Sequence, residues 1–386
     1  MQVRDFLLGL CLGAAFLMIP SLRARLRGNS AYIEDDQVWE TLYQTYCQDN
    51  GPRVTVIGGG TGLSTLLRGL KQYSSNLVAI VNVTDDGGSS GRLRANLDML
   101  PPGDIRNCLL ALANTEPLLE KVFQYRFTSG DGLVGHNLGN LFLAALTEEF
   151  GFEEAVVAAS RVLAVKGEVL PVTLAKLDLV AHFTDGRVVR GESRIPAEGG
   201  QIQRLYLDPE NSVVYPAAAK AIGEAEVVLV GPGSLYTSIL ANLLVPGVVS
   251  AIRQSQARKV FICNVMTQPG ETDGYTAADH LQTIYDHVGA NLFDVVIINS
   301  NFNMPSHVLA KYTLDGAVPV APDLERLQKM GVEVLSADLI SLHEVVRHDQ
   351  DKLARIILAE ALTCRKSLKG KRRKRTGRTG RKEGAR

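Results

Sequence analysis

The feature that most constrains the fold is a strand, a glycine-rich turn and a helix within residues 54–70, VTVIGGGTGLSTLLRGL. Val54, Val56 and Ile57 form a short β-branched run, and leucines recur at helical spacing after the turn. Glycine lets the chain adopt positive φ and approach a ligand closely, while the start of the helix directs free N–H groups at anionic oxygen. The segment therefore predicts a phosphate-binding turn in an α/β protein.

This turn differs from two common nucleotide motifs. The strict dinucleotide fingerprint requires a third small residue where this chain has Leu63 or Thr65. A Walker loop is excluded because no Lys-Ser or Lys-Thr pair follows the glycines. An ordinary tight strand-to-helix turn remains the alternative.

Strand and helix patterns alternate along the chain, which predicts a doubly wound, mostly parallel sheet with covered faces. Helices are expected at about 138–150 and 155–164, and Asp104 is placed to cap another. The candidate strands are 53–57, 77–83, 226–230, 259–264 and 294–298, with one more near 332–335.

Residues 168–195 have a different pattern. Apolar residues alternate from Leu177 to Phe183, and an Asp185-Gly186 turn precedes a second extended run. Alternation around such a turn is typical of a hairpin. We therefore expect a small β-hairpin insertion on the α/β body, which itself spans residues 52–360.

The formal net charge of zero hides an asymmetry. Residues 365–386 hold 12 of the 41 Lys and Arg but one of the 41 acidic residues, which leaves a net charge of −11 on the remainder. An acidic body has no positive field for nucleic acid, so no specific nucleic-acid partner is expected. The basic tail cannot bury enough apolar surface to fold, and we expect it to be disordered. Anionic lipid is its expected partner, with a merely solvated tail as the alternative.

The N-terminal segment 1–27 predicts a membrane anchor. Residues 6–22 are uncharged, and the Arg excess at 23–27 would keep the following domain, joined by a connector at 28–51, on the cytoplasmic side. A cleaved signal peptide and a buried N-terminal helix remain alternatives. Five widely spaced cysteines without a CxxC pair indicate reduced thiols and no zinc site.

The second predicted strand ends in TDDGGSSGRLR, residues 84–94. In a doubly wound fold this position lies beside the first phosphate turn. Asp85 and Asp86 either accept hydrogen bonds from a ribose or hold Mg²⁺ that bridges phosphates. Gly87 and Gly88 begin a run of further N–H and hydroxyl donors, and Arg92 can neutralise phosphate charge. A solvated turn is the alternative.

Two further segments place polar residues at helix entrances. PPGDIRN, residues 101–107, contains Asp104, whose presence capping alone explains, and Asn107. GHNLGN, residues 135–140, contains His136, which is more often a structural residue than a catalytic base. Asn137 and Asn140 are interpreted as polar recognition groups.

The strand at 226–230 leads into a second phosphate-style turn, GPGSLYTSILANLLVPG, residues 231–247. Gly231 and Gly233 shape it, and Ser234 can cap the following helix. Two such turns at the carboxyl edge of one sheet predict a bipartite ligand, a nucleotide with a substantial second moiety. The loop CNVMTQPGETDGYTAADH, residues 263–280, suits hydroxyl-rich groups, with a capped loop as the alternative.

Together GGGTGLS, TDDGGSSGRLR, PPGDIRN, GHNLGN and the two later segments resemble the YvcK-like gluconeogenesis factor family, related to the 2-phospho-L-lactate transferase CofD. The resemblance implies a modified Rossmann-like fold, binding of UDP-sugars such as UDP-N-acetylglucosamine, and a role in cell shape and cell-wall metabolism during gluconeogenic growth. It places ligand contacts on the turn at 58–62, on Asp85 and Asp86, on the loop that begins at Gly231, and on Asn264 and Tyr275. With the residues read from the motifs above, the predicted contacts are Gly58, Gly59, Gly60, Thr61, Gly62, Asp85, Asp86, Gly87, Gly88, Arg92, Asn107, Asn137, Asn140, Gly231, Gly233, Ser234, Asn264 and Tyr275.

Three functions compete on this basis. The first is a nucleotide-sugar-binding regulator at the inner face of the membrane. The second is a Mg²⁺-dependent phosphotransferase of the CofD type with Asp85 and Asp86 as metal ligands, although TDDGGSSGRLR matches the YvcK-like branch better. A nicotinamide-dependent dehydrogenase is the third. A homo-oligomer is also expected.

Overall fold

The computed structural model describes residues 51–114, 117–342 and 346–361, which fall within the second of two compact units, Cys47–Arg386. The predicted anchor, most of the connector and the basic tail lie outside the described residues. No single helix among the described ones is long and apolar enough to cross a membrane. The bent pair Leu235–Leu243 and Val248–Gln254, at 70°, meets the length and composition requirement only when taken together.

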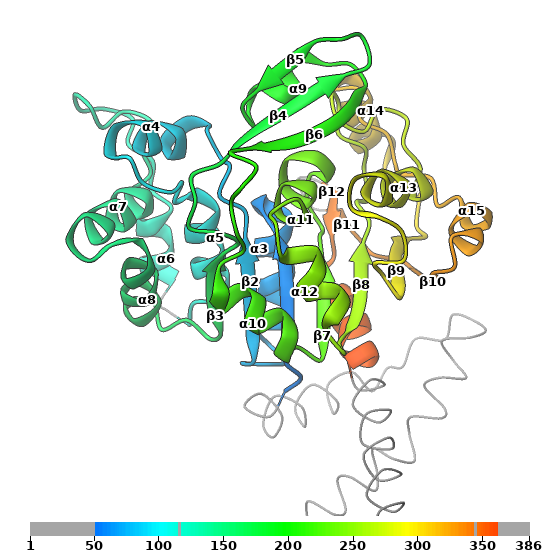
Figure 1. Ribbon diagram of the computed structural model, residues 1–386, viewed down its shortest axis with the longest axis horizontal. Coiled ribbons are helices and arrows are strands. Elements are labelled where there is room, and N and C mark those ends of the chain that lie inside the picture. Colours follow the sequence, from blue (N-terminus) through cyan, green and yellow to red (C-terminus); the bar gives the residue numbers. More distant parts are fainter. Residues whose placement is uncertain (1–50, 115–116, 343–345, 362–386) are drawn as a thin grey trace, which may run out of the picture. The chain divides into compact units, whose positions relative to one another are not determined.

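Seven parallel strands form the central sheet, in the order β10-β9-β8-β7-β1-β2-β3 (Figure 1). β-Branched and leucine side chains fill the central strands, as expected for a sheet covered on both faces. The bounds are β1 Val54–Gly58, β2 Leu77–Val81, β3 Glu168–Pro171, β7 Val227–Val230, β8 Arg258–Ile262, β9 Val295–Asn299 and β10 Glu333–Ala337. The predicted doubly wound, mostly parallel sheet is confirmed.

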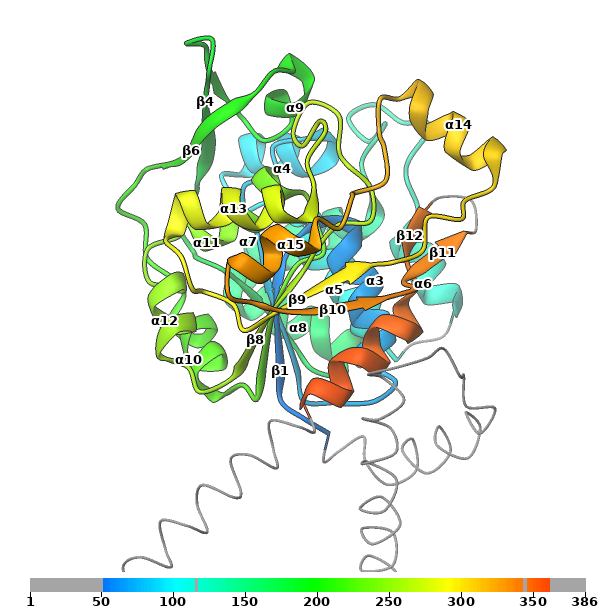
Figure 2. The same cartoon turned by 90° about the vertical axis from the view of Figure 1, so that its right-hand side faces the viewer.

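Helices cover both faces of this sheet, with α3, α5 and α8 on one side and α10, α12 and α13 on the other (Figure 2). The helices between β1 and β3 are α3 Gly60–Leu70, α4 Gly88–Leu97, α5 Gly103–Leu112, α6 Pro117–Phe123, α7 Leu138–Phe150 and α8 Phe152–Val162. Later in the chain are α10 Pro216–Glu224, the π-helix η1 Leu235–Leu240, α11 Ala241–Leu243, α12 Val248–Gln254, α13 Ala277–Val288, α14 Ser306–Leu314 and α15 Leu324–Lys329, and residues 350–361 are also helical.

The β insertion differs from its predicted bounds of 168–195. β3 joins the central sheet beside β2 and is not part of the insertion. The prediction was wrong at this strand because a short apolar strand carries no local signal of which sheet it enters. The insertion is instead a three-stranded antiparallel sheet, β5-β4-β6, made of β4 Asp178–Phe183, β5 Val188–Arg190 and β6 Ile202–Asp208, with helix α9 Arg194–Glu198. The Asp185-Gly186 turn does join β4 to β5, as predicted. A further two-stranded sheet pairs β11 Ile340–Leu342 with β12 Val346–His348.

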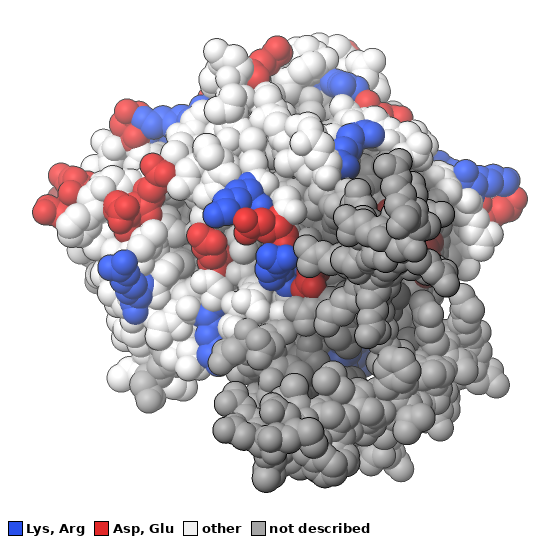
Figure 3. Space-filling model, turned by 60° about the horizontal axis from the view of Figure 1, so that its bottom comes forward, with Lys and Arg blue, Asp and Glu red and all other residues white. Residues whose placement is uncertain are grey.

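Acidic and basic side chains alternate on the face shown in Figure 3, without a large field of one sign among the residues described there. The core beneath is apolar and continuous from the central sheet into the insertion. Leu179, Ala181 and Phe183 of β4 belong to the same buried cluster as Ile57 and Val230. The insertion is therefore packed onto the body and shares its core.

Candidate functional site

The two glycine turns lie against each other at the carboxyl edge of the sheet. β1 pairs with both β2 and β7, and the chain leaves this point in opposite directions, so this edge is the topological switch point. A Cβ atom on Gly62 would stand 2.8 Å from the Pro232 carbonyl oxygen, and one on Gly233 would stand 3.4 Å from the Gly59 oxygen. Glycine at these positions is thus what lets the turns touch.

The first turn leaves amide donors open. α3 begins at Gly60, whose φ is +66° and whose N–H donates to Asp104 Oδ2 at 2.8 Å. Within the described part of the chain, the N–H groups of Thr61 and Gly62 have no acceptor. A helix start with unsatisfied amides is an anion site, so the predicted phosphate-binding role of this turn has a matching geometry.

The second turn is partly satisfied from within, although the N–H groups of Ser234 and Leu235 have no acceptor in the described part of the chain. The Gly233 N–H donates to Asn264 Oδ1 at 3.2 Å, and the Tyr236 N–H donates to Glu271 Oε2 at 3.3 Å. Ser234 also donates its hydroxyl to Glu271, which is only 6% exposed and whose pKa is raised, chiefly by burial. An internal carboxylate therefore occupies the place that we expected for a ligand phosphate, and the helix that follows begins as the π-helix η1.

Tyr275, the predicted sugar-side residue, follows the same loop. Its hydroxyl lies 2.9 Å from the Tyr236 hydroxyl, and its side chain is half-buried. These contacts account for Ser234, Asn264 and Tyr275 within the protein itself. Their contact with a ligand stays a prediction.

The predicted acidic loop divides into a short turn and a helix. α4 begins at Gly88, because Gly87 takes an extended conformation as its N-cap, so only residues 84–87 form the loop. Asp85 Oδ1 accepts the Gly87 N–H at 2.9 Å. Asp86 Oδ1 instead accepts the Ser193 N–H of the β insertion at 2.9 Å. The two aspartates thus have different partners: Asp85 shapes the turn and Asp86 holds the insertion.

Two carboxyl groups that the sequence did not assign to the site lie beside Asp85. Desolvation raises the pKa of Asp104 to about 6, with the Asp85 charge adding to the rise and the Gly60 hydrogen bond opposing it. Desolvation also raises the pKa of Glu192, and the charges of Asp85 and Asp104 add to it. Asp104 is not the predicted cap, since it lies inside the first turn of α5 and Pro102 occupies the N-cap position. Glu192 follows β5 and carries no local signal.

Arg106 connects the next group of predicted residues. Its Nη1 donates to Asn140 Oδ1 at 2.5 Å and its Nη2 donates to Asn107 Oδ1 at 2.7 Å. Desolvation lowers its pKa to about 10. The Asn137 side chain caps α7, accepting the N–H groups of Gly139 and Asn140. The structure therefore brings Asn107 and Asn140 together, while Asn137 has a structural role.

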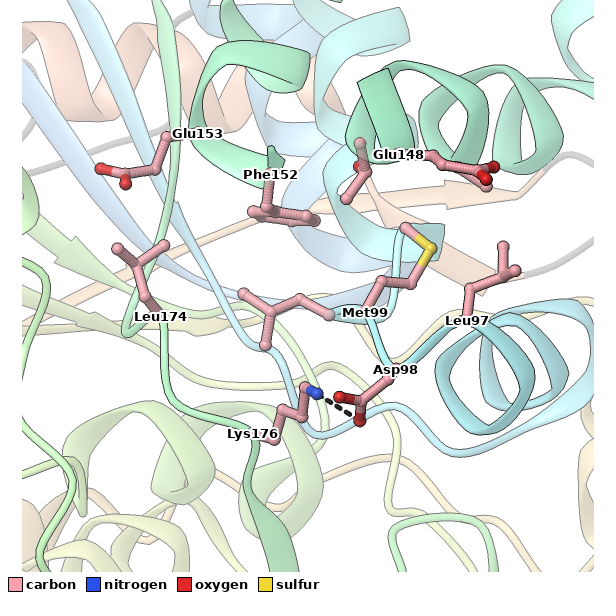
Figure 4. A pocket seen from close by; sticks show the side chains of 11 residues that line it. Leu97, Asp98, Met99, Glu148, Phe152, Glu153, Leu174 and Lys176 are labelled. Carbon is pink, nitrogen blue, oxygen red and sulfur yellow. Dashed lines mark ion pairs between the residues drawn. The ribbon is translucent and has the colours of Figure 1, made fainter. Parts of the chain in front are cut away.

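Two hollows of the described surface lie away from the glycine turns. One of about 450 Å³ is lined by residues of α4, α7, α8 and the 174–176 segment, with Met99 and Phe152 on its apolar wall and an ion pair of Lys176 with Asp98 at its rim (Figure 4). None of the predicted site residues lines it. The support for the candidate site is therefore the open amides of the first turn and the topology of the sheet, and not this hollow.

A resident metal has limited support from these residues. No three His, Cys, Asp or Glu side chains in the described ranges are grouped in a way that would hold a metal ion. Mg²⁺ needs fewer protein ligands, because it is usually held by one or two carboxylates together with substrate phosphates and water. Asp85 and Asp104 fit that role, whereas Asp86 is engaged by the insertion.

Comparison with known proteins shows the family of the chain. The family model described as 2-phospho-L-lactate transferase CofD matches residues 54–340. The chain belongs to the CofD family. It is 50% identical over 309 residues to the gluconeogenesis factor of Bacillus subtilis, covering 80% of this chain and 97% of that protein. It is 52% identical over 312 residues to a putative gluconeogenesis factor of Nostoc, covering 80% and 68%.

A solved structure has the same fold. The crystal structure of protein BH3568 from Bacillus halodurans superposes with a TM-score of 0.78 at 50% identity, covering 80% of this chain and 99% of that one. The predicted resemblance to gluconeogenesis factors and CofD is therefore confirmed.

Proposed function

We propose that this CofD-family protein binds a nucleotide-sugar of the UDP-N-acetylglucosamine type and acts as a regulator of gluconeogenic metabolism, cell shape and cell-wall synthesis. The observation that carries the proposal is the pair of open amides at Thr61 and Gly62, at the switch point between β1 and β7. Such a position suits the phosphates of a nucleotide. The relatives named gluconeogenesis factor support the metabolic role.

The nucleoside and sugar would lie along the loops that follow β7 and β8. These loops place Asn264 and Tyr275 near the second turn, where amide and phenol groups suit the hydroxyls of a sugar. Glu271 holds that turn rigid, so in this proposal the second turn shapes the site and the first binds the phosphates.

The test places a negative charge at the proposed phosphate position. Thr61 is exposed at the start of α3, so Thr61→Glu should weaken UDP-N-acetylglucosamine binding at least tenfold in calorimetric titration, roughly 1.4 kcal/mol. Asn96→Glu makes the same charge change on an exposed residue near the end of α4 and should leave the affinity within about twofold. Equal affinities for the two variants, or no binding of any UDP-sugar to the unaltered protein, would contradict the proposal.

A second candidate is a Mg²⁺-dependent phosphotransferase of the CofD type. The observation that favours it is the pair of desolvated carboxyl groups, Asp104 and Glu192, which lie near the charge of Asp85 beside the open amides. When bound, Mg²⁺ would neutralise phosphate charge there, with Asp85 and Asp104 as ligands. Turnover of a nucleotide-diphosphate-linked donor that stops with EDTA and in Asp104→Asn protein would support it. Tight binding without turnover would count against it.

We also propose that the protein is attached to the inner face of the membrane through residues 1–27, that the basic tail binds anionic lipid, and that the chain forms a homo-oligomer. Each Lys or Arg near an anionic surface contributes about 1 kcal/mol. Liposome flotation of variants lacking 1–27 or 365–386 should separate the two segments, and failure of the intact protein to float would defeat both. Light scattering would test the oligomer.

A further inference from the structure

A chain of hydrogen bonds from Arg106 to His136 has a direction that follows from the chemistry of its members. Arg106 can only donate, so Asn140 must present Oδ1 to it and turn Nδ2 toward Ser89 Oγ, at 3.1 Å. The Asn137 N–H also donates to Ser89 Oγ, at 3.3 Å. A hydroxyl oxygen accepts two hydrogen bonds, so the Ser89 O–H remains to donate to His136 Nδ1, at 3.1 Å. His136 must then carry its hydrogen on Nε2.

This imidazole is neutral and its donor is open. His136 is 6% exposed, and desolvation together with the charges of Arg92 and Arg126 lowers its pKa. Nε2 has no hydrogen-bond partner in the described part of the chain, yet it is not among the fully buried polar atoms that lack one. The Nε2–H group is therefore accessible at the surface.

Arg92 lies against the residue that precedes His136, and its charge acts on the imidazole. A Cβ atom on Gly135 would lie 3.1 Å from Arg92 Nη2, which puts the guanidinium group against the residue that precedes His136. Arg92 is exposed and forms no hydrogen bond or ion pair with any described residue. It lines a hollow of about 350 Å³ together with Gly130, Asp131, Gly132 and Val134, and His136 is not among these lining residues.

We propose that His136 and Arg92 form a subsite for a phosphate-class anion, with Ser89 as the positioning residue that fixes the His136 tautomer. Both groups donate, and a neutral imidazole beside a guanidinium adds a hydrogen bond without a second desolvated positive charge. Ser89 is 4% exposed and its oxygen is enclosed by Asn137 and Asn140, so it orients the imidazole and is closed to attack on a ligand. Where the anion is the diphosphate of a nucleotide-sugar, this inference rests on the function proposed above. A free phosphate-class anion has the same chemistry.

The first test reads the tautomer directly. In protein labelled with ¹⁵N-histidine, long-range ¹H–¹⁵N spectra of the unliganded state should show His136 protonated on Nε2. Ser89→Ala should convert it to a mixture of tautomers while the protein still melts cooperatively. Protonation of the unaltered protein on Nδ1, or an unchanged tautomer in the variant, would overturn the inference.

The second test uses inorganic pyrophosphate and UDP-N-acetylglucosamine as probes. Each should shift the His136 Nε2 resonance. His136→Asn keeps an acceptor for Ser89 but loses the outer donor, and should bind at least tenfold more weakly. His136→Gln places an amide N–H near the Nε2 position and should recover part of that loss.

The outcomes separate this subsite from the proposed function. If UDP-N-acetylglucosamine does not bind but pyrophosphate shifts His136, the subsite stands and the nucleotide-sugar function fails. If UDP-N-acetylglucosamine binds while neither probe shifts His136 and His136→Asn binds normally, the function stands and the subsite is wrong. If neither probe binds the unaltered protein, both are wrong.

Discussion

Asp104 makes the site measurably sensitive to pH. Its carboxyl group accepts the Gly60 N–H and has a pKa raised from 3.8 to about 6, mainly by desolvation. At 1.36 kcal/mol per pKa unit this rise corresponds to about 3 kcal/mol, an upper figure because the residue is only half-buried. The folded pKa lies above the unfolded one. Asp104 therefore favours folding most when it is protonated, below its pKa in the unfolded state. This contribution to the free energy of unfolding is lost as pH rises through its pKa in the folded state.

Asp104→Asn keeps an oxygen acceptor for Gly60 and removes the charge. We expect the variant to be more stable than the unaltered protein by about 1 to 3 kcal/mol at about pH 7.5, and by no more than about 0.5 kcal/mol near pH 4. Urea denaturation at both pH values measures the free energies of unfolding. Comparing the two proteins at each pH cancels the other titrating groups.

Asp98→Asn is the matched control. Asp98 is exposed and has a left-handed φ of 54°, which asparagine tolerates, so its replacement should change stability by less than about 0.5 kcal/mol at both pH values. The reasoning is refuted if Asp104→Asn is the less stable protein at about pH 7.5, or if its advantage is the same at both pH values.

Two further predictions concern packing and acid sensitivity. Gly270 has a φ of +81°, and a Cβ atom there would stand 2.2 Å from the Pro196 carbonyl oxygen of the insertion. Gly270→Ala should lower the free energy of unfolding by about 2 kcal/mol or more in urea, and Gly274→Ala, with a φ of +72° and open space, by about 1 kcal/mol; equal losses would contradict the contact. His348 is buried against the Cys263 carbonyl with its pKa lowered from 6.5 to about 4 by desolvation. As pH falls, the histidine of the unfolded state is protonated before that of the folded state, so the unaltered protein should lose about 3 kcal/mol of its free energy of unfolding between about pH 7 and 4. His348→Gln should not lose this stability, as urea denaturation at the two pH values would show. Equal acid sensitivity of the two proteins would refute this.

Local patterns were sufficient for much of the fold. β1, β7 and β9 begin and end within one residue of the predicted strands, because β-branched runs bounded by polar residues carry their signal locally. The bounds predicted for α7 match the observed ones, because helical periodicity is also a local signal. β3 was assigned to the insertion, since no local pattern distinguishes an edge strand of the parallel sheet from a strand of a hairpin.

The site was less accessible to this reasoning. The glycines of the first turn were recognisable because backbone geometry depends on residue type at that position. The sequence did not predict that Glu271 fills the second turn, because Glu271 lies 35 residues beyond Tyr236 in the chain. Asp104 resembled a helix cap, but it lies inside the first turn of α5 and accepts the Gly60 N–H instead.

The sequence by itself determined that the chain forms a parallel α/β sheet with a glycine-rich turn after its first strand, because periodicity and glycine content act over a few neighbouring residues. The tertiary structure decided which side chains fill the second turn, which aspartate holds the insertion, and which carboxyl groups are desolvated together. These properties depend on contacts between residues far apart in the chain. They arise only when β1 and β7 come together and the β insertion packs over their ends.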